Sequence, residues 1–313
     1  RFNIQRVIGE SGTRALDFVT HQSELYSALA RVYATQLFTE RVRREFIAER
    51  RGESTPKPAK AAISADYAPW VAAYRERTLV KVAAAETLEA VAATCRRLCG
   101  FQGVLHANRL SVFEDMARSF HAAGGDSRLL LLEAGKQLLG ADAGVPSLPG
   151  ALGTGIGDAR SALRLVSRHE RMLTGELAAR VERAGGAGRL DVHGWNPHLP
   201  QLEELARVHI TRRILEEFDE AIASGEDSWR EAMDAVRCLY GIDVLLKSAA
   251  WHLNHGSLRP GDLDVLRYAH TNAVGRVGRS LDSLLDGLAV PPGRVGGFIG
   301  RTDYVSRVAS LLQ

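Results

Sequence analysis

Two glycine-containing stretches that lie close together in the chain carry residue types suited to holding a ligand. Cys95 to Leu110 reads CRRLCGFQGVLHANRL, and Phe120 to Gly140 reads FHAAGGDSRLLLLEAGKQLLG. In the first stretch, Gly100 and Gly103 let a backbone approach a ligand without interference from a Cβ atom. The same spacing is equally typical of a corner between two helices. The residues alone leave both interpretations open.

The second stretch begins a helix with groups that can bind an anion. Gly124 and Gly125 precede Asp126 and Ser127, which are favourable residues for a helix start. The free N–H groups of a first helical turn can bind an anion or a polarised carbonyl oxygen. These residues predict either a capped helix or a ligand-binding surface.

Other motifs point to structure rather than chemistry. GTGIGD, residues 153–158, has the glycines of a dinucleotide fingerprint, but no strand precedes it and we interpret it as a linker. His252 and His255 lie three apart on one helix face, without the carboxylates that a metal-binding bundle requires. Cys95 and Cys99 have no second Cys/His pair at zinc-like spacing. We therefore expect no metal site.

His21 and Gln22 lie inside the first long helical pattern. A polar pair there faces solvent or fills a packing gap, or its amide reaches a cofactor. Helix position alone slightly favours the first interpretation.

Composition favours a helical protein. The 313 residues are 45% hydrophobic and 25% charged, with a net charge of +3. Acidic and basic residues are interleaved, which is typical of solvated helix faces and not of a nucleic-acid-binding surface. No apolar run has the length of a membrane span. The three cysteines suggest reduced thiols and a cytoplasmic location.

Apolar periodicity predicts an all-α fold of two helical bundles. The Gly- and Pro-rich segment ADAGVPSLPGALGTGIGD marks the boundary, which gives a bundle at 1–140, a linker at 141–157 and a second helical domain at 158–313. FQGVLHANRL is expected to be a loop. The expected helices are 16–51, 68–98, 111–120, 125–140, 158–184, 200–224, 228–254 and 261–286.

Several of these stretches together resemble the acyl-CoA oxidases, within the acyl-CoA dehydrogenase superfamily. LDFVTHQSELYSALARVYA is similar to the family's helix containing THQ, and CRRLCGFQGVLHANRL to its CRExCGGxGFLxANRI segment. GGDSRLLLLEAGKQLL resembles EGDNTVLLQxxAKxLL, and LYGIDVLLKSAAWHLNHGSL resembles part of the closing helical domain. The resemblance covers nearly the whole chain and implies the all-helical C-terminal half of such a protein.

The resemblance implies an FAD site. Arg1 and Phe2 resemble the end of the family's RRQF, where an arginine meets the FAD pyrophosphate, and Gln22 falls where an amide faces the nucleotide of a partner subunit. A glycine loop, a helix N-terminus and an arginine also suit a pyrophosphate on physical grounds.

The two glycine-containing stretches hold the other implied positions. Arg97, Gly100 and Gly103 lie on the segment that cradles FAD across the family's dimer interface. Asp126 and Ser127 match the Asp-Asn pair that follows the catalytic glutamate and lies near the adenosine.

The chain departs from the family at the general base. Gly124 stands where the family has the glutamate that removes the substrate's α-proton. Glycine has no side chain to accept a proton, although its N–H can still bind a thioester carbonyl. Phe101 also replaces the second glycine of the family's pair, and Val104 an aromatic residue.

The expected function is part of an FAD-dependent protein that dehydrogenates acyl-CoA at the α and β carbons. Two alternatives stay open: a non-catalytic subunit that completes the FAD site of a partner, or a superfamily member with other thioester chemistry. The family carries an N-terminal helical domain and a β-domain before this region. We therefore expect a homodimer, or a heteromer with a subunit that supplies those domains.

Overall fold

The regular structure of the chain is helical. In a computed structural model, the described residues are 3, 6–8, 12–53, 74–140, 156 and 159–290. These ranges contain helices and no strand, and an isolated bridge pairs Val7 with Arg14. The prediction of an all-α fold is therefore confirmed.

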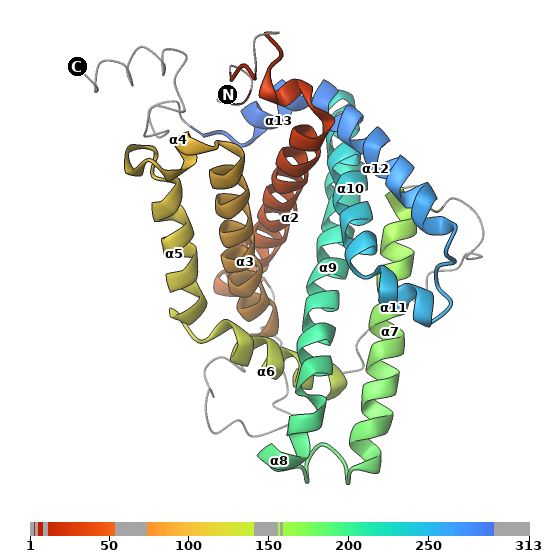
Figure 1. Cartoon of the computed structure of the whole chain (residues 1–313). Helices are drawn as coiled ribbons and strands as arrows, with labels where there is room; N and C mark the ends of the chain where they lie inside the picture. Colours follow the sequence, from red (N-terminus) through yellow and green to blue (C-terminus); the bar gives the residue numbers. More distant parts are fainter. Residues whose placement is uncertain are drawn as a thin grey trace.

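The first half of the chain folds as helices that lie side by side (Figure 1). The long α2 packs on α3, and α3 packs on both α5 and α6. The elements are η1 (Ala15–Asp17), α2 (Val19–Arg50), α3 (Arg75–Leu98), α4 (Phe101–Val104), η2 (His106–Asn108), α5 (Leu110–Ala122) and α6 (Ser127–Gly140).

The second half adds four long helices, α7, α9, α10 and α12, beside those of the first half. Figure 1 shows α9 beside α10, with α7 and α12 on the side away from α5. The elements are α7 (Ala159–Arg183), α8 (Val192–Trp195), η3 (Asn196–His198), α9 (Leu199–Ser224), α10 (Asp227–Lys247), α11 (Ala249–Asn254), α12 (Asp262–Arg279) and α13 (Leu281–Gly287).

Helices from both sides of the predicted boundary share one hydrophobic core. Phe38 of α2, Leu131 of α6 and Phe218 of α9 are fully buried in it. Burying an aromatic or leucine side chain stabilises a fold by roughly 1.5–3 kcal/mol. The boundary at 141–157 stays a prediction, because apart from Ile156 it lies outside the described residues.

Three helical segments differ from the sequence-based expectation. The predicted helix 228–254 is two helices, because the chain turns at Ser248, whose Oγ donates to the Val244 carbonyl at 2.9 Å. Such a back-bond bends a helix. The predicted helix 261–286 likewise breaks at Ser280. The predicted loop FQGVLHANRL was wrong, since it forms α4 and η2 before Arg109 turns into the left-handed region.

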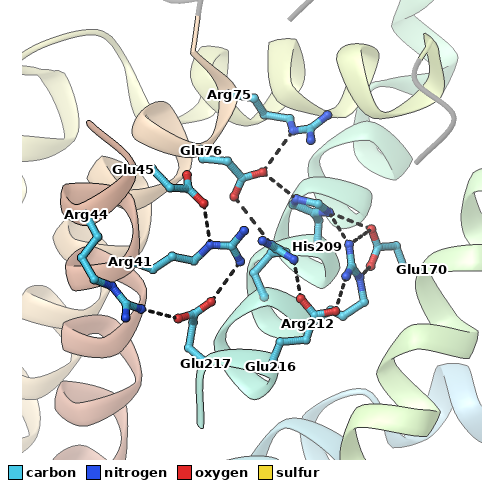
Figure 2. Close-up of polar contacts among 11 residues, drawn as sticks. Arg41, Arg44, Glu45, Arg75, Glu76, Glu170, His209, Arg212, Glu216 and Glu217 are labelled. Carbon is cyan, nitrogen blue, oxygen red and sulfur yellow. Dashed lines mark hydrogen bonds and ion pairs between the residues drawn. The ribbon is translucent and has the colours of Figure 1, made fainter. Parts of the chain in front are cut away.

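A buried ionic network ties both halves together (Figure 2). His209 of α9 contacts two carboxylates: its Nδ1 lies 2.7 Å from Glu170 of α7 and its Nε2 3.1 Å from Glu76 of α3. Arg212, also of α9, donates to Glu170 at 2.5 Å. The network continues to α2, where Arg41 donates to Glu217 at 3.0 Å. Each buried charge thus has an opposite charge within reach, as burial requires.

Candidate functional site

The corner between α5 and α6 is built from two glycines with positive φ. Gly124 has φ 70° and Gly125 φ 104°, a conformation that favours glycine. A Cβ atom at Gly124 would meet no atom within 4 Å, so this exposed corner has free space around it. The N–H groups of Gly124 and Gly125 form no hydrogen bond with another described residue. The corner therefore presents two free backbone donors.

Asp126 is the N-cap of α6. Its Oδ1 accepts hydrogen bonds from the N–H groups of Arg128 at 2.9 Å and Leu129 at 3.2 Å. A cap of this kind satisfies donors that the first helical turn leaves open. The carboxylate that lies nearest to Gly124 in sequence is therefore engaged in capping, which makes it a poor general base.

Lys81 of α3 holds the corner together, and sequence reasoning missed it. Its Nζ donates to the carbonyls of His121 at 3.1 Å and Gly125 at 2.7 Å, and to Ser127 Oγ at 2.9 Å. Burial lowers the pKa of Lys81, and the charge of Asp126 opposes that effect. One lysine in a helical pattern gives no signal that it reaches across to another helix.

Ser127 lies in the same polar cluster. Its Oγ lies 3.1 Å from His121 Nδ1, and His121 Nε2 lies 3.1 Å from Glu89 Oε2. The side chain of Ser127 thus faces α3 and the end of α5 within this chain. Its predicted role beside an adenosine stays a prediction.

The second group of predicted residues lies where α2 begins and α3 ends. Gln22 Nε2 donates to the Leu16 carbonyl at 2.9 Å, so this amide supports η1. Arg97 pairs with Glu24 on the exposed surface. Arg1 and Phe2 lie outside the described residues.

The two glycines after α3 have structural reasons of their own. Gly100 has φ 56°, and a Cβ there would meet the Arg6 guanidinium at 3.1 Å. That guanidinium donates to the Leu98 carbonyl at 2.9 Å. A Cβ at Gly103 would lie 1.9 Å from the Arg96 carbonyl oxygen. The chain's own backbone therefore makes the close approach at Gly103.

The predicted residues form two separate groups within one chain. Gln22, Arg97, Gly100 and Gly103 lie near α4, whereas Gly124, Asp126 and Ser127 lie near the start of α6. Figure 1 shows α4 and α6 at opposite ends of α5, which spans about 20 Å at 1.5 Å per residue.

The outer surface near α4 and α5 is apolar. Phe101 is 75% exposed and Val104 54% exposed. Phe113, Met116 and Phe120 follow at helical spacing on α5, each more than 40% exposed. This surface continues from the first group of predicted residues toward the second.

The described residues contain neither a grouped set of metal ligands nor a membrane-spanning helix. Within the described ranges, no three His, Cys, Asp or Glu side chains are grouped so as to hold a metal ion. In the same part of the chain, every helix is too short or too polar to cross a membrane.

Solved structures similar to this chain are acyl-CoA oxidases. Acyl-CoA oxidase 1 from Yarrowia lipolytica is 18% identical with a TM-score of 0.81 over 99% of this chain and 50% of that one. Acyl-CoA oxidase-1 from Caenorhabditis elegans, complexed with FAD and ATP, is 19% identical with a TM-score of 0.80 over 99% and 50%. Acyl-CoA oxidase 1 from Arabidopsis thaliana is 17% identical, with a TM-score of 0.74 over 97% of this chain and 48% of that one. The chain thus spans about half the length of these structures.

Family models match both halves of the sequence. Residues 2–139 match the acyl-CoA oxidase C-alpha1 domain, and residues 161–303 match the acyl-CoA oxidase model. Among curated proteins, no sequence gives a significant match. The resemblance read from the sequence motifs is confirmed, and the chain belongs to the acyl-CoA oxidase family, of which it represents the C-terminal half.

Proposed function

We propose that this chain is part of an FAD-dependent protein that binds acyl-CoA and dehydrogenates the acyl chain at its α and β carbons. Family membership supports this reaction class. FAD, when bound, accepts the hydride that leaves the β carbon. The chain's own contribution is to bind the thioester and to form one wall of the cofactor site.

The free donors at the glycine corner carry the proposal. The N–H groups of Gly124 and Gly125 have no partner among the described residues, and the space around Gly124 is open. Two N–H groups aimed at a thioester carbonyl stabilise the negative charge that develops there when the α-proton leaves. Lys81 keeps this corner in place through the Gly125 carbonyl.

The surface near α4 fits one wall of a nucleotide site. Arg97 is exposed, and Arg6 lies against Gly100, so two guanidinium groups flank a backbone turn. Guanidinium groups suit a pyrophosphate because they bind its oxygens in pairs. Since the two groups of predicted residues lie at opposite ends of α5, we propose that one FAD contacts them from two copies of the chain, which makes the protein a dimer.

A second candidate function follows from the same corner. Gly124 supplies no base, Asp126 caps α6, and Glu89 contacts His121. Each described carboxylate near the corner is thus already engaged. A chain without a base at this position suits a non-catalytic subunit that completes the FAD site of a partner.

The test is the visible absorption spectrum of the purified protein, before and after anaerobic addition of octanoyl-CoA. A bound flavin that bleaches supports dehydrogenation with a base from elsewhere. A bound flavin that stays oxidised contradicts dehydrogenation by this chain. The absence of any flavin band means that this wall does not hold FAD by itself, which contradicts the first candidate for the isolated chain and agrees with a subunit that completes the site of a partner.

The variant Gly124→Glu tests whether the chain lacks only the general base or lacks the rest of the catalytic site as well. A carboxylate there has room, at a backbone cost on the order of 1 kcal/mol for the positive φ. If the rest of the site is intact, flavin bleaching by octanoyl-CoA should appear or accelerate at least tenfold. Gly175→Glu is the matched control, because Gly175 is an exposed, uncrowded glycine in α7.

A further inference from the structure

A cavity of about 570 Å³ lies between the two halves of the chain. Its lining comes from α2, α3, α7, α9, α10 and α11. Small-molecule sites commonly have volumes of roughly 300–1,000 Å³, so the cavity has the size of a ligand site.

Most charged groups in the cavity wall already have partners. Arg207 contacts Glu86 and donates to Glu203 at 2.9 Å. Glu204 lies 3.2 Å from His169, and the Asp243 carboxylate 3.1 Å from His270. Each of these groups thus already has a polar partner within the chain.

Two cations in the wall have no such partner. Arg31 of α2 and Lys247 at the end of α10 form neither a hydrogen bond nor an ion pair with any described residue. They lie close enough for repulsion, because burial and then the charge of Arg31 lower the pKa of Lys247, against the opposing effect of Asp243 and Glu86. Two neighbouring unpaired cations favour an anion between them.

The rest of the wall is mainly apolar. Trp251 lines the cavity, and its ring is fixed between His169, at 3.6 Å between centroids, and His255, at 3.9 Å. Val166 and Ile214 add aliphatic surface. A ligand here therefore has an apolar or aromatic body.

We propose that this cavity binds a small amphipathic anion, with its carboxylate or phosphate between Arg31 and Lys247 and its apolar body toward Trp251. The guanidinium can bind either head group through two oxygens, and the ammonium adds a second positive charge. A ligand bound here contacts helices of both family models, and the lining of the cavity includes neither Gly124 nor Gly125.

The test is isothermal titration calorimetry of the protein with octanoate and with phenyl phosphate. The unmodified protein should bind at least one of them. Arg31→Gln and Lys247→Gln should each raise the Kd of the bound ligand about tenfold or more, because each removes one hydrogen bond to a charged group. Arg267→Gln is the matched control, because Arg267 is an exposed cation of α12 that pairs with Asp264. This variant should bind the ligand with an unchanged Kd.

A second variant keeps the test independent of charge. Val208→Trp places an indole in the cavity and should abolish binding, while circular dichroism checks that the helices remain. Binding of octanoate alone or of phenyl phosphate alone supports the site and shows which of the two ligands fits it. The proposal is overturned if neither ligand binds, or if the Kd is the same in both cation variants and in the control.

Discussion

The Glu170 carboxylate and the His209 imidazole lie 2.7 Å apart in the interior of the molecule, and both side chains are almost completely buried. Arg212 holds the same carboxylate from a second direction. Burial would raise the pKa of Glu170, but the hydrogen bonds from His209 and Arg212 outweigh it and lower that pKa. The carboxylate is therefore charged in the folded protein and depends on both partners.

We expect Glu170→Gln to lower the free energy of unfolding by about 3–5 kcal/mol, because it leaves two buried cations without their shared carboxylate. Urea unfolding followed by circular dichroism measures the change. Glu45→Gln is the control, since Glu45 is 46% exposed and its pair with Arg41 should contribute less than about 1 kcal/mol. Equal losses of unfolding free energy in the two variants would show that the buried ion pair contributes no more to stability than the exposed one.

The same network should give stability a pH optimum. Burial by itself would raise the pKa of Glu76. The hydrogen bond from His209 and the charges of His209, Arg75 and Arg41 outweigh burial and lower this pKa to about 2. Its contribution is complete above its ordinary value of 4.5 and is lost as the pH falls toward 2. The pKa of His209 is raised, because its two carboxylates outweigh burial. Its contribution is complete below its ordinary value of 6.5 and is lost as the pH rises through the folded value.

The network should therefore stabilise most between pH 4.5 and 6.5. Unfolding free energies measured from pH 3 to 9 test this, with His209→Gln as the comparison. The difference between the two proteins should shrink on the alkaline side. A difference that stays constant above pH 6.5 would contradict a charged His209.

His252 should make stability depend on pH in the opposite direction to His209. It is fully buried, and neither ring nitrogen has a hydrogen-bond partner. Burial, followed by the charges of His169, His255 and Arg168, lowers its pKa to about 4. The folded state therefore holds the neutral ring, and the stability that depends on it is present above pH 6.5 and lost as the pH falls toward 4.

We expect His252→Leu to stabilise the protein by about 1–3 kcal/mol, because it removes an unsatisfied buried polar group. The gain should be larger at pH 5 than at pH 7. Thermal unfolding at both values measures it, and His193→Leu, at an exposed position, should change neither. A loss of stability at both pH values would mean that the ring has a partner.

Two glycines should respond oppositely to alanine. Gly103→Ala puts a methyl group on the Arg96 carbonyl, and overpacking of this kind costs typically about 1–3 kcal/mol. Gly175→Ala, in an exposed helix interior with nothing nearby, should stabilise by about 0.5–1 kcal/mol. Denaturant midpoints of the two variants should shift in opposite directions, and a shared sign would contradict the close approach at Gly103.

Lys81→Met should loosen the glycine corner. It removes donors from the His121 and Gly125 carbonyls and from Ser127 Oγ, at a cost of about 1–3 kcal/mol. Amide hydrogen exchange should accelerate at residues 121–127 more than elsewhere. Arg128→Gln is the control, because Arg128 is 77% exposed and should leave these rates unchanged.

Local signals in the sequence predicted the helices well and their joints poorly. Gly100 ends α3, and Asp126 starts α6, because a positive φ and a cap are properties of one residue. The breaks at Ser248 and Ser280 escaped prediction, since serine is compatible with a helix interior and apolar residues continue on both sides. Tertiary packing determines those bends.

The site residues show the same division. Gly103 was recognised as a position of close backbone approach, and within the chain the approaching atom is the Arg96 carbonyl oxygen. Its role beside FAD stays a prediction. The sequence could not reveal the roles of Lys81, Arg31 and Lys247. Each of these cations acts together with residues that are far away in the chain. Only the folded arrangement brings such partners together.

Helix α9 packs on α2 and α6 of one half and on α7 and α10 of the other, and its His209 and Arg212 complete the buried network. Relatives of known structure share only 15–20% of this chain's residues. A chimera that joined one half of this chain to the other half of such a relative would keep the network only where the relative supplies matching charges, because an unmatched buried charge is costly. Although two family models divide the chain, the buried ion pairs cross that division, so a substitution in one half leaves a charge of the other half without its partner.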